Sequence, residues 1–165
     1  MEQNPLQAVL SARAELETLT PLKTNCGRVC GGACCQDDDT GENGMLLFPG
    51  EEALYSQPME GFAFHLVRDD TLYQGGWRLV CRGQCQRQHR PLACRLFPLF
   101  LHFKKDGTPR VKLDNRAKSV CPLCSYGLVG LRAEFVSAAK DAYAALMEDA
   151  DCAAFLRALD EAFSL

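Results

Sequence analysis

The chain has 165 residues and a formal net charge of -3, and 47% of its residues are apolar. This length predicts a single domain over residues 1–165, and the apolar content is enough for a hydrophobic core, which argues against a disordered chain. Lysine and arginine are scattered, so nothing in the charge pattern favours nucleic acid or an anionic membrane. Metal ions, small molecules and a protein partner remain as candidate partners.

The ten cysteines are a high number for a chain of this size, and their meaning depends on the compartment. The N-terminus lacks the basic region and apolar run of a secretory signal. No apolar segment approaches the roughly 20 residues that a membrane span needs. We therefore expect a cytoplasmic protein, in which reducing conditions favour metal ligation over a disulfide framework.

The first predicted element is a helix that begins at Asn4 and Pro5. Asn is a good N-cap, Pro suits the first helical position, and apolar residues recur at helical spacing up to Pro21. These apolar residues are Leu6, Val9, Leu10, Leu16 and Leu19. We expect this helix to pack against helices near the C-terminus.

Four cysteines and three glycines follow within ten residues, from Cys26 to Cys35. Thiols this close together are hard to pair as disulfides, whereas a tetrahedral ion or an iron–sulfur cluster requires several sulfurs around one point. The glycines permit the turns that such a loop needs. The pattern predicts a metal site, with a redox disulfide cluster or buried structural thiols as the alternatives.

Short strands are predicted in the middle of the chain. Residues 45–48 are one candidate, and residues 62–67 and 77–80 flank a glycine-containing turn, so that the last strand ends at Cys81. A brief helix opens at Pro49 and runs through Tyr55. Its Glu51 or Glu52 is a candidate carboxylate ligand or a support for one.

The second half of the chain predicts a hairpin and two helices. Residues 99–103 and 110–113 flank an Asp-Gly turn, and the pair Cys121 and Cys124 has the CxxC spacing that chelates one metal from a tight turn. Helical spacing begins near Gly127 and is interrupted at residues 149–151. Cys152 lies inside the last helix and is predicted to be a small buried residue.

The predicted metal ligands are far apart in the sequence, so they can meet only if the fold closes over them. The expected fold is a small α+β, cysteine-rich, metal-bound domain with an N-terminal helix, short strands and a hairpin. Its metal-binding core would cover residues 22–126 and its helical part residues 127–165. A structural zinc ion contributes on the order of 10 kcal/mol to folding. The nine ligand candidates are Cys26, Cys30, Cys34, Cys35, Cys81, Cys85, Cys94, Cys121 and Cys124.

Three blocks of sequence carry a family resemblance. The crowded Cys26–Cys35 segment, the segment Leu46-Leu47-Phe48-Pro49-Gly50-Glu51-Glu52, and the later Cys85 with His89-Arg90-Pro91-Leu92-Ala93-Cys94-Arg95-Leu96-Phe97-Pro98 resemble the YkgJ-type family of CxxCxxCC cysteine cluster proteins. That resemblance implies a zinc- or iron-chelating domain. The chain differs from the signature in having three residues, not two, between Cys26 and Cys30 and between Cys30 and Cys34. A more distant similarity links the pattern to flagellin lysine N-methylases, where it implies an iron–sulfur site.

Two arginines in the later block are the candidate cofactor-binding residues. A metal centre with four thiolates carries a net negative charge, so neighbouring cations should compensate it, and Arg90 and Arg95 are placed to do so. An ordinary ion pair with an acidic residue is the alternative for Arg95. Pro91 and Pro98 would restrict the backbone on both sides of Cys94.

Neither the metal nor the reaction follows from the spacing. The thiols suit two four-thiolate zinc sites, a multinuclear zinc cluster, or a [4Fe–4S] cluster beside other thiols. Without a phosphate loop, HExxH or GxSxG motif, the leading hypothesis is a metal-binding protein with a structural or metal-handling role. A cluster-dependent redox or methyl-transfer enzyme is the first alternative. A redox sensor that cycles Cys121 and Cys124 through a disulfide is the second.

Overall fold

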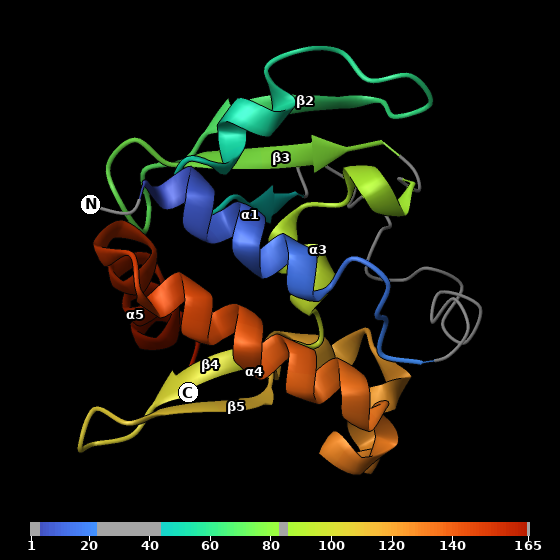
Figure 1. Ribbon diagram of the computed structural model, residues 1–165, viewed down its shortest axis with the longest axis vertical. Coiled ribbons are helices and arrows are strands. Elements are labelled where there is room, and N and C mark those ends of the chain that lie inside the picture. Colours follow the sequence, from blue (N-terminus) through green and yellow to red (C-terminus); the bar gives the residue numbers. More distant parts are fainter. Residues whose placement is uncertain (1–3, 23–43, 83–85, 165) are drawn as a thin grey trace.

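The computed structural model describes residues 4–22, 44–82 and 86–164, and its helices and strands form an α+β fold (Figure 1). This confirms the predicted fold class, with an N-terminal helix, small antiparallel sheets and two C-terminal helices. The α-helices and strands are α1 (Pro5–Glu15), β1 (Met45–Leu46), β2 (Phe64–Arg68), β3 (Trp77–Cys81), α3 (Leu92–Leu96), β4 (Leu99–Phe103), β5 (Pro109–Leu113), α4 (Ala133–Met147) and α5 (Ala150–Phe163). Short 3₁₀ helices are η2 (Glu51–Tyr55), η3 (Arg87–His89), η4 (Asn115–Ser119), η5 (Pro122–Tyr126) and η6 (Leu128–Gly130).

Helix α1 begins as predicted but ends earlier. The Asn4 side chain accepts a hydrogen bond from the Leu6 amide at 3.0 Å, and Pro5 is the first helical residue. The helix ends at Glu15, and Leu16 caps it instead of continuing towards Pro21. Its buried residues are Ala8, Val9 and Ala12.

The predicted apolar stripe of α1 was wrong at one position. Leu10 is 38% exposed because it lies on the face opposite Ala8 and Ala12. The small side chains of the buried face let α1 approach α4 closely, and α1 also contacts α5 (Figure 1). The predicted packing of the first helix against the C-terminal helices is confirmed.

The first sheet has the strand order β1-β3-β2 and is antiparallel throughout. β2 and β3 flank the predicted turn, with Leu66 opposite Leu79. β1 is shorter than the predicted strand over residues 45–48, because the chain leaves the sheet at Leu47 and sends the Phe48 side chain into the core. A small second core lies against this sheet and is formed by Leu47, Tyr55, Phe62 and Leu79.

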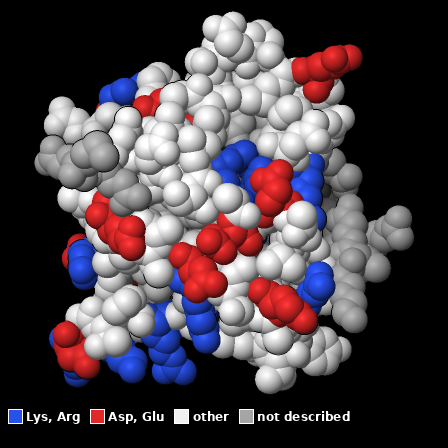
Figure 2. Space-filling model, in the orientation of Figure 1, with Lys and Arg blue, Asp and Glu red and all other residues white. Residues whose placement is uncertain are grey.

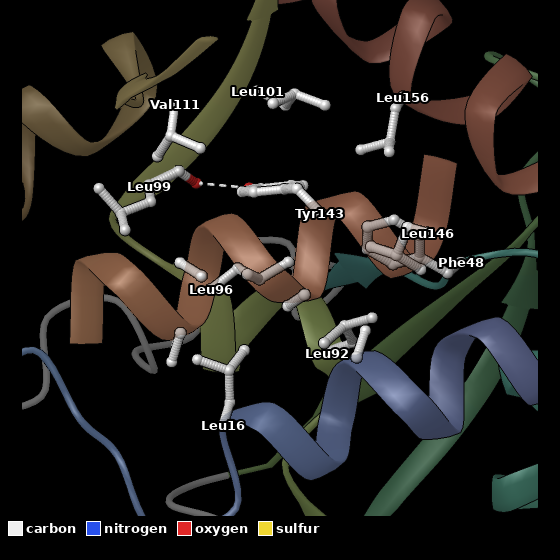
Figure 3. Close-up of a cluster of buried hydrophobic side chains, with 14 of the residues drawn as sticks. Leu16, Phe48, Leu92, Leu96, Leu99, Leu101, Val111, Tyr143, Leu146 and Leu156 are labelled. Carbon is white, nitrogen blue, oxygen red and sulfur yellow. Dashed lines mark hydrogen bonds between the residues drawn. The ribbon is translucent and has the colours of Figure 1, made fainter. Parts of the chain in front are cut away.

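The second sheet is the predicted hairpin, in which β4 pairs with β5 and Leu101 lies opposite Val111. Gly107 occupies the turn with a φ of 85°, a left-handed conformation that glycine adopts without strain. The hairpin packs against α4 and α5, and the Tyr143 hydroxyl donates a hydrogen bond to the Leu99 carbonyl at 3.2 Å (Figure 3).

One main hydrophobic core joins elements from both ends of the chain. Figure 3 shows Leu16 from the N-terminal segment, Leu92 and Leu96 from α3, and Tyr143 and Leu146 from α4 in a single cluster. The predicted metal-binding part (22–126) and helical part (127–165) therefore share this core. The C-terminal helices share this core with Leu92 and Leu96 beside Cys94 and with Leu123 between Cys121 and Cys124, whereas Cys81 packs against the second core.

The surface shown in Figure 2 carries acidic and basic side chains side by side rather than in separate fields. Among the described residues, no helix combines the length and the apolar character needed to cross a bilayer.

Candidate metal centre

The nine predicted ligands divide into two sets. Cys26, Cys30, Cys34, Cys35 and Cys85 lie outside the described residues. The other four are placed: Cys81 ends β3, Cys94 lies in α3, and Cys121 and Cys124 belong to the turn at η5. Within the described ranges, no three Cys, His, Asp or Glu side chains gather into a group that could hold a metal ion.

Cys121 and Cys124 are brought together by a short backbone turn. Pro122 starts η5, and the Cys124 amide donates a hydrogen bond to the Cys121 carbonyl at 3.1 Å. Both residues are free, half-buried thiols. Leu123 between them is 7% exposed and packs into the main core, which anchors the turn. Two soft sulfur donors on one turn fit a zinc ion or an iron–sulfur cluster.

The surroundings of Cys124 raise the pKa of its thiol. Burial, the neighbouring Cys121 and the carboxylate of Asp114 raise the pKa of Cys124 to about 11, while Lys118 acts in the opposite direction. A thiol with a raised pKa is a weak nucleophile near neutral pH. A bound cation would displace the proton of Cys124, because only the thiolate ligates a metal.

Cys94 lies on α3, and the start of this helix is held by a buried carboxylate. Glu51 is fully buried, and its Oε1 accepts a hydrogen bond from the amide of Leu92, the first residue of α3, at 2.7 Å. Oε2 accepts from the Phe48 amide at 3.0 Å, and Arg13 Nη1 lies 3.1 Å from Oε1. Glu51 was a candidate support for the metal site, and its described contacts give it the role of a cap on the cysteine-bearing helix.

The backbone before α3 is held by the side chain of Arg95, which folds back over it. Nη2 of Arg95 donates to the carbonyls of Arg87 and Gln88 at 3.3 and 3.2 Å. Its Nε donates to the carbonyl of Arg90 at 3.0 Å. One guanidinium thus binds three of the four carbonyls between residues 87 and 90.

Two further side chains complete this arrangement. Arg13 on α1 donates from Nη1 to the Arg90 carbonyl at 2.9 Å and from Nη2 to the Gln88 carbonyl at 3.3 Å. The hydroxyl of Tyr55 donates to the His89 carbonyl at 2.8 Å. Every carbonyl from residue 87 to residue 90 therefore accepts a side-chain hydrogen bond. We call Arg13, Tyr55 and Arg95, with the carbonyls that they bind, the carbonyl clamp.

Arg95 has no N–H left over for a sulfur ligand. Its Nη1 bonds to the Arg13 carbonyl and to the carboxylate of Glu17, both at 3.4 Å, so the five N–H groups of the guanidinium meet five acceptors. The Arg95 side chain is 5% exposed, whereas that of Glu17 is 66% exposed. Burial, together with the nearby Arg13, lowers the pKa of Arg95. Its predicted action on a metal centre could therefore operate only through its charge or through the backbone that it holds.

The remaining candidates have simpler surroundings. Arg90 is half-buried at the end of the clamped segment, and its cofactor-binding role stays a prediction. The ring of His89 stacks on Phe62, with centroids 6.0 Å apart. Cys152 is fully buried, with its sulfur near the Pro5 carbonyl, which confirms the prediction that it is a small core residue.

Sequence reasoning missed Arg13 and Tyr55. Neither is near a cysteine in the sequence, and Arg13 looks like an ordinary solvent-facing residue of an amphipathic helix. Only the packing of α1 and η2 around α3 reveals their contacts with residues 88–90. The buried Glu51, by contrast, was detectable as one of two acids after a Pro-Gly turn.

No protein-family model, no curated protein and no solved structure matches this chain.

Proposed function

We propose that this chain is a cysteine-ligated metal-binding protein in which zinc or an iron–sulfur cluster has a structural or metal-handling role. The observation that carries the proposal is the turn of Cys121 and Cys124, where the Cys124 amide donates a hydrogen bond to the Cys121 carbonyl at 3.1 Å and Leu123 anchors the backbone in the core. Two converging thiols hold a soft metal from two sides, and further ligands would come from the other predicted cysteines.

The sequence resemblance to a family of cysteine cluster proteins supports the same proposal. The block from Cys85 to Pro98 resembles the YkgJ-type cysteine cluster family, and a zinc- or iron-chelating role is what this family implies. In this proposal the thiolates of Cys121 and Cys124 bind the metal, and Cys94 is a further ligand from α3. A bound zinc ion would supply cross-linking, and an iron–sulfur cluster would supply electron transfer. The proposed location is the cytoplasm.

The two alternatives receive less support. The raised pKa of Cys124 argues against a thiol redox sensor, which needs a reactive thiolate. An enzyme needs a substrate site beside the metal. A cavity of about 180 Å³ between α3, β4 and α5 has a mainly apolar lining. A second pocket, of about 460 Å³, has the arginine and aromatic lining that an enzyme would need, from residues such as Tyr55, Phe64 and Arg82, but no described cysteine lines either of the two.

A protein partner is compatible with the surface next to the CxxC turn. Val129 is 93% exposed and Tyr126 is 70% exposed, and both follow Cys124 within a few residues. Exposed apolar side chains that lie close together are typical of contact surfaces. Such a surface would place a partner beside the proposed metal ligands.

Metal analysis tests the proposal directly. The full chain is purified without oxygen, and zinc, iron and acid-labile sulfide are measured per chain for the wild type and for Cys121→Ser/Cys124→Ser. We expect metal in the wild type and a loss of at least one equivalent in the double variant. Cys152→Ser, which changes a buried core thiol, serves as the control and should keep its metal. Wild-type protein without metal, even after reconstitution with zinc or with iron and sulfide, would overturn the proposal.

A further inference from the structure

The carbonyl clamp holds the backbone of residues 87–90, shortly before one of the proposed ligands, Cys94. We infer that Arg95, assisted by Arg13 and Tyr55, is a positioning residue that holds the backbone of Cys94 ready to bind the metal. This inference rests on the proposed function. It gives Arg95 a task other than neutralising the charge of a metal centre.

The first step of the argument is where Arg95 lies relative to Cys94. Arg95 follows Cys94 directly on α3, and its guanidinium returns to the carbonyls of Arg87, Gln88 and Arg90. These hydrogen bonds close a loop of the chain from residue 87 to residue 95, and Cys94 is part of this loop. A movement of the α3 backbone at Cys94 would therefore strain the hydrogen bonds of the adjacent Arg95.

The second step concerns the helix itself. α3 has five residues, a length at which an isolated helix is not stable in water. Its first residue, Leu92, is held by the hydrogen bond from its amide to Glu51. The segment that leads into the helix is held by the carbonyl clamp. Leu92 and Leu96 anchor the other face of α3 in the main core. Protein groups alone therefore hold α3 in its orientation.

The third step is the consequence for metal binding. A ligand that is already held in place loses little conformational freedom when the metal binds, so preorganisation raises affinity. Residues that orient metal ligands typically account for 10- to 100-fold in metal affinity. Loss of the clamp should therefore weaken binding and remove the Cys94 sulfur from the metal, although no ligand has been changed.

Cobalt(II) binding to the full chain under anaerobic conditions tests the inference, because cobalt–thiolate charge-transfer bands report the number of bound sulfurs. Arg95→Gln and Cys94→Ser should lose similar band intensity, and Arg95→Gln should bind cobalt about 10- to 100-fold more weakly than the wild type. Arg68→Gln changes an exposed arginine on β2 and is the matched control, with wild-type bands and affinity expected.

Arg95→Lys separates positioning from charge. Lysine keeps the positive charge, but its single ammonium group cannot reach the acceptors that the planar guanidinium binds together. A positioning role predicts that Arg95→Lys behaves like Arg95→Gln. If Arg95→Lys instead keeps wild-type affinity and bands, Arg95 acts through its charge and the inference is overturned.

Tyr55→Phe keeps the test decisive if the Arg95 variants do not fold, as judged by circular dichroism. It removes one hydrogen bond, to the His89 carbonyl, and should weaken cobalt binding several-fold in a folded protein. Unchanged affinity in a folded Tyr55→Phe variant would then count against the clamp. A wild-type protein that shows no thiolate bands with cobalt and also binds no iron and sulfide on reconstitution would refute the proposed function itself. Thiolate bands that persist unchanged in Cys94→Ser would overturn the inference alone.

Discussion

The two described regions that carry predicted ligands are built in opposite ways. The Cys121–Cys124 turn is closed by its own backbone, with one hydrogen bond across the pair and one buried residue, Leu123, as anchor. The segment around Cys94 is held by the neighbouring Arg95 together with side chains from distant parts of the sequence, among them Arg13 and Glu51. The first region depends on local sequence, and the second depends on the fold as a whole.

This difference has a consequence for how each region fails. A turn that is defined locally should keep its shape when remote contacts are lost, so its thiols stay together as long as the core holds. The Cys94 segment should loosen whenever α1, η2 or α3 shifts, because its carbonyls are bonded to all three. We therefore expect mutations remote in sequence to affect Cys94 first.

The strongest test of this contrast is Glu51→Ala. The substitution removes the ion-pair partner of Arg13 and leaves a cavity in its place. It also removes the acceptor of the Leu92 and Phe48 amides. Loss of one partner of a buried ion pair costs about 3–5 kcal/mol, and we expect a decrease of this size in the free energy of unfolding, measured with urea. Glu17→Ala also removes a carboxylate from an arginine, but this one is 66% exposed, so the expected loss is below about 1 kcal/mol.

Leu123→Ala tests the buried anchor of the CxxC turn in the main core. Leu123 is 7% exposed within the main core, and truncation of a buried leucine costs about 2–5 kcal/mol. We expect the lower half of this range because the residue lies at the edge of the core. Val129→Ala, at a residue that is 93% exposed, should change the free energy of unfolding by less than about 0.5 kcal/mol. Equal effects of the two substitutions would mean that Leu123 does not anchor the turn.

Tyr55→Phe examines one bond of the clamp without changing packing volume. It removes the hydroxyl that donates to the His89 carbonyl, and it should lower the free energy of unfolding, measured by thermal denaturation, by about 1 kcal/mol. Hydrogen exchange should show faster exchange of amides near residues 88–95, while the Cys124 amide in the local turn keeps its protection. Uniform acceleration over both regions would contradict the proposed contrast.

A contact remote from both regions provides a reference for pH dependence. Burial of Asp160 favours its neutral form, but hydrogen bonds from His102, the Phe103 amide and Ser164 outweigh burial and lower its pKa below 3.8. The folded state therefore binds this proton more weakly than the unfolded state, so the stabilisation is present above the unfolded pKa and disappears as the pH falls through the folded one. In Asp160→Asn the free energy of unfolding should therefore fall less than in the wild type as the pH is lowered, by about 1 kcal/mol or less. If the free energy of unfolding of the variant falls as steeply at acid pH as that of the wild type, Asp160 does not contribute to this pH dependence.

The sequence by itself determined the elements whose signals are local. The cap at Asn4, the Asp-Gly turn between β4 and β5, the strand that ends at Cys81 and the break before α5 all follow from residues that are neighbours in the chain. Such elements follow from short-range hydrogen bonding and from the spacing of apolar residues, and both can be recognised in the amino-acid sequence. The burial of Cys152 was predictable for a related reason, since it lies on an apolar helix face.

Only the tertiary structure decided how the later cysteine block is held. Nothing in the sequence near Cys94 indicates that Arg13, about 80 positions earlier, binds the carbonyls that precede it. The same holds for Arg95, whose guanidinium binds the backbone carbonyls of Arg87, Gln88 and Arg90, while its effect on a metal centre stays a prediction. The physical reason is that a buried guanidinium must satisfy five donors at once, and which acceptors surround it is fixed by how distant elements pack.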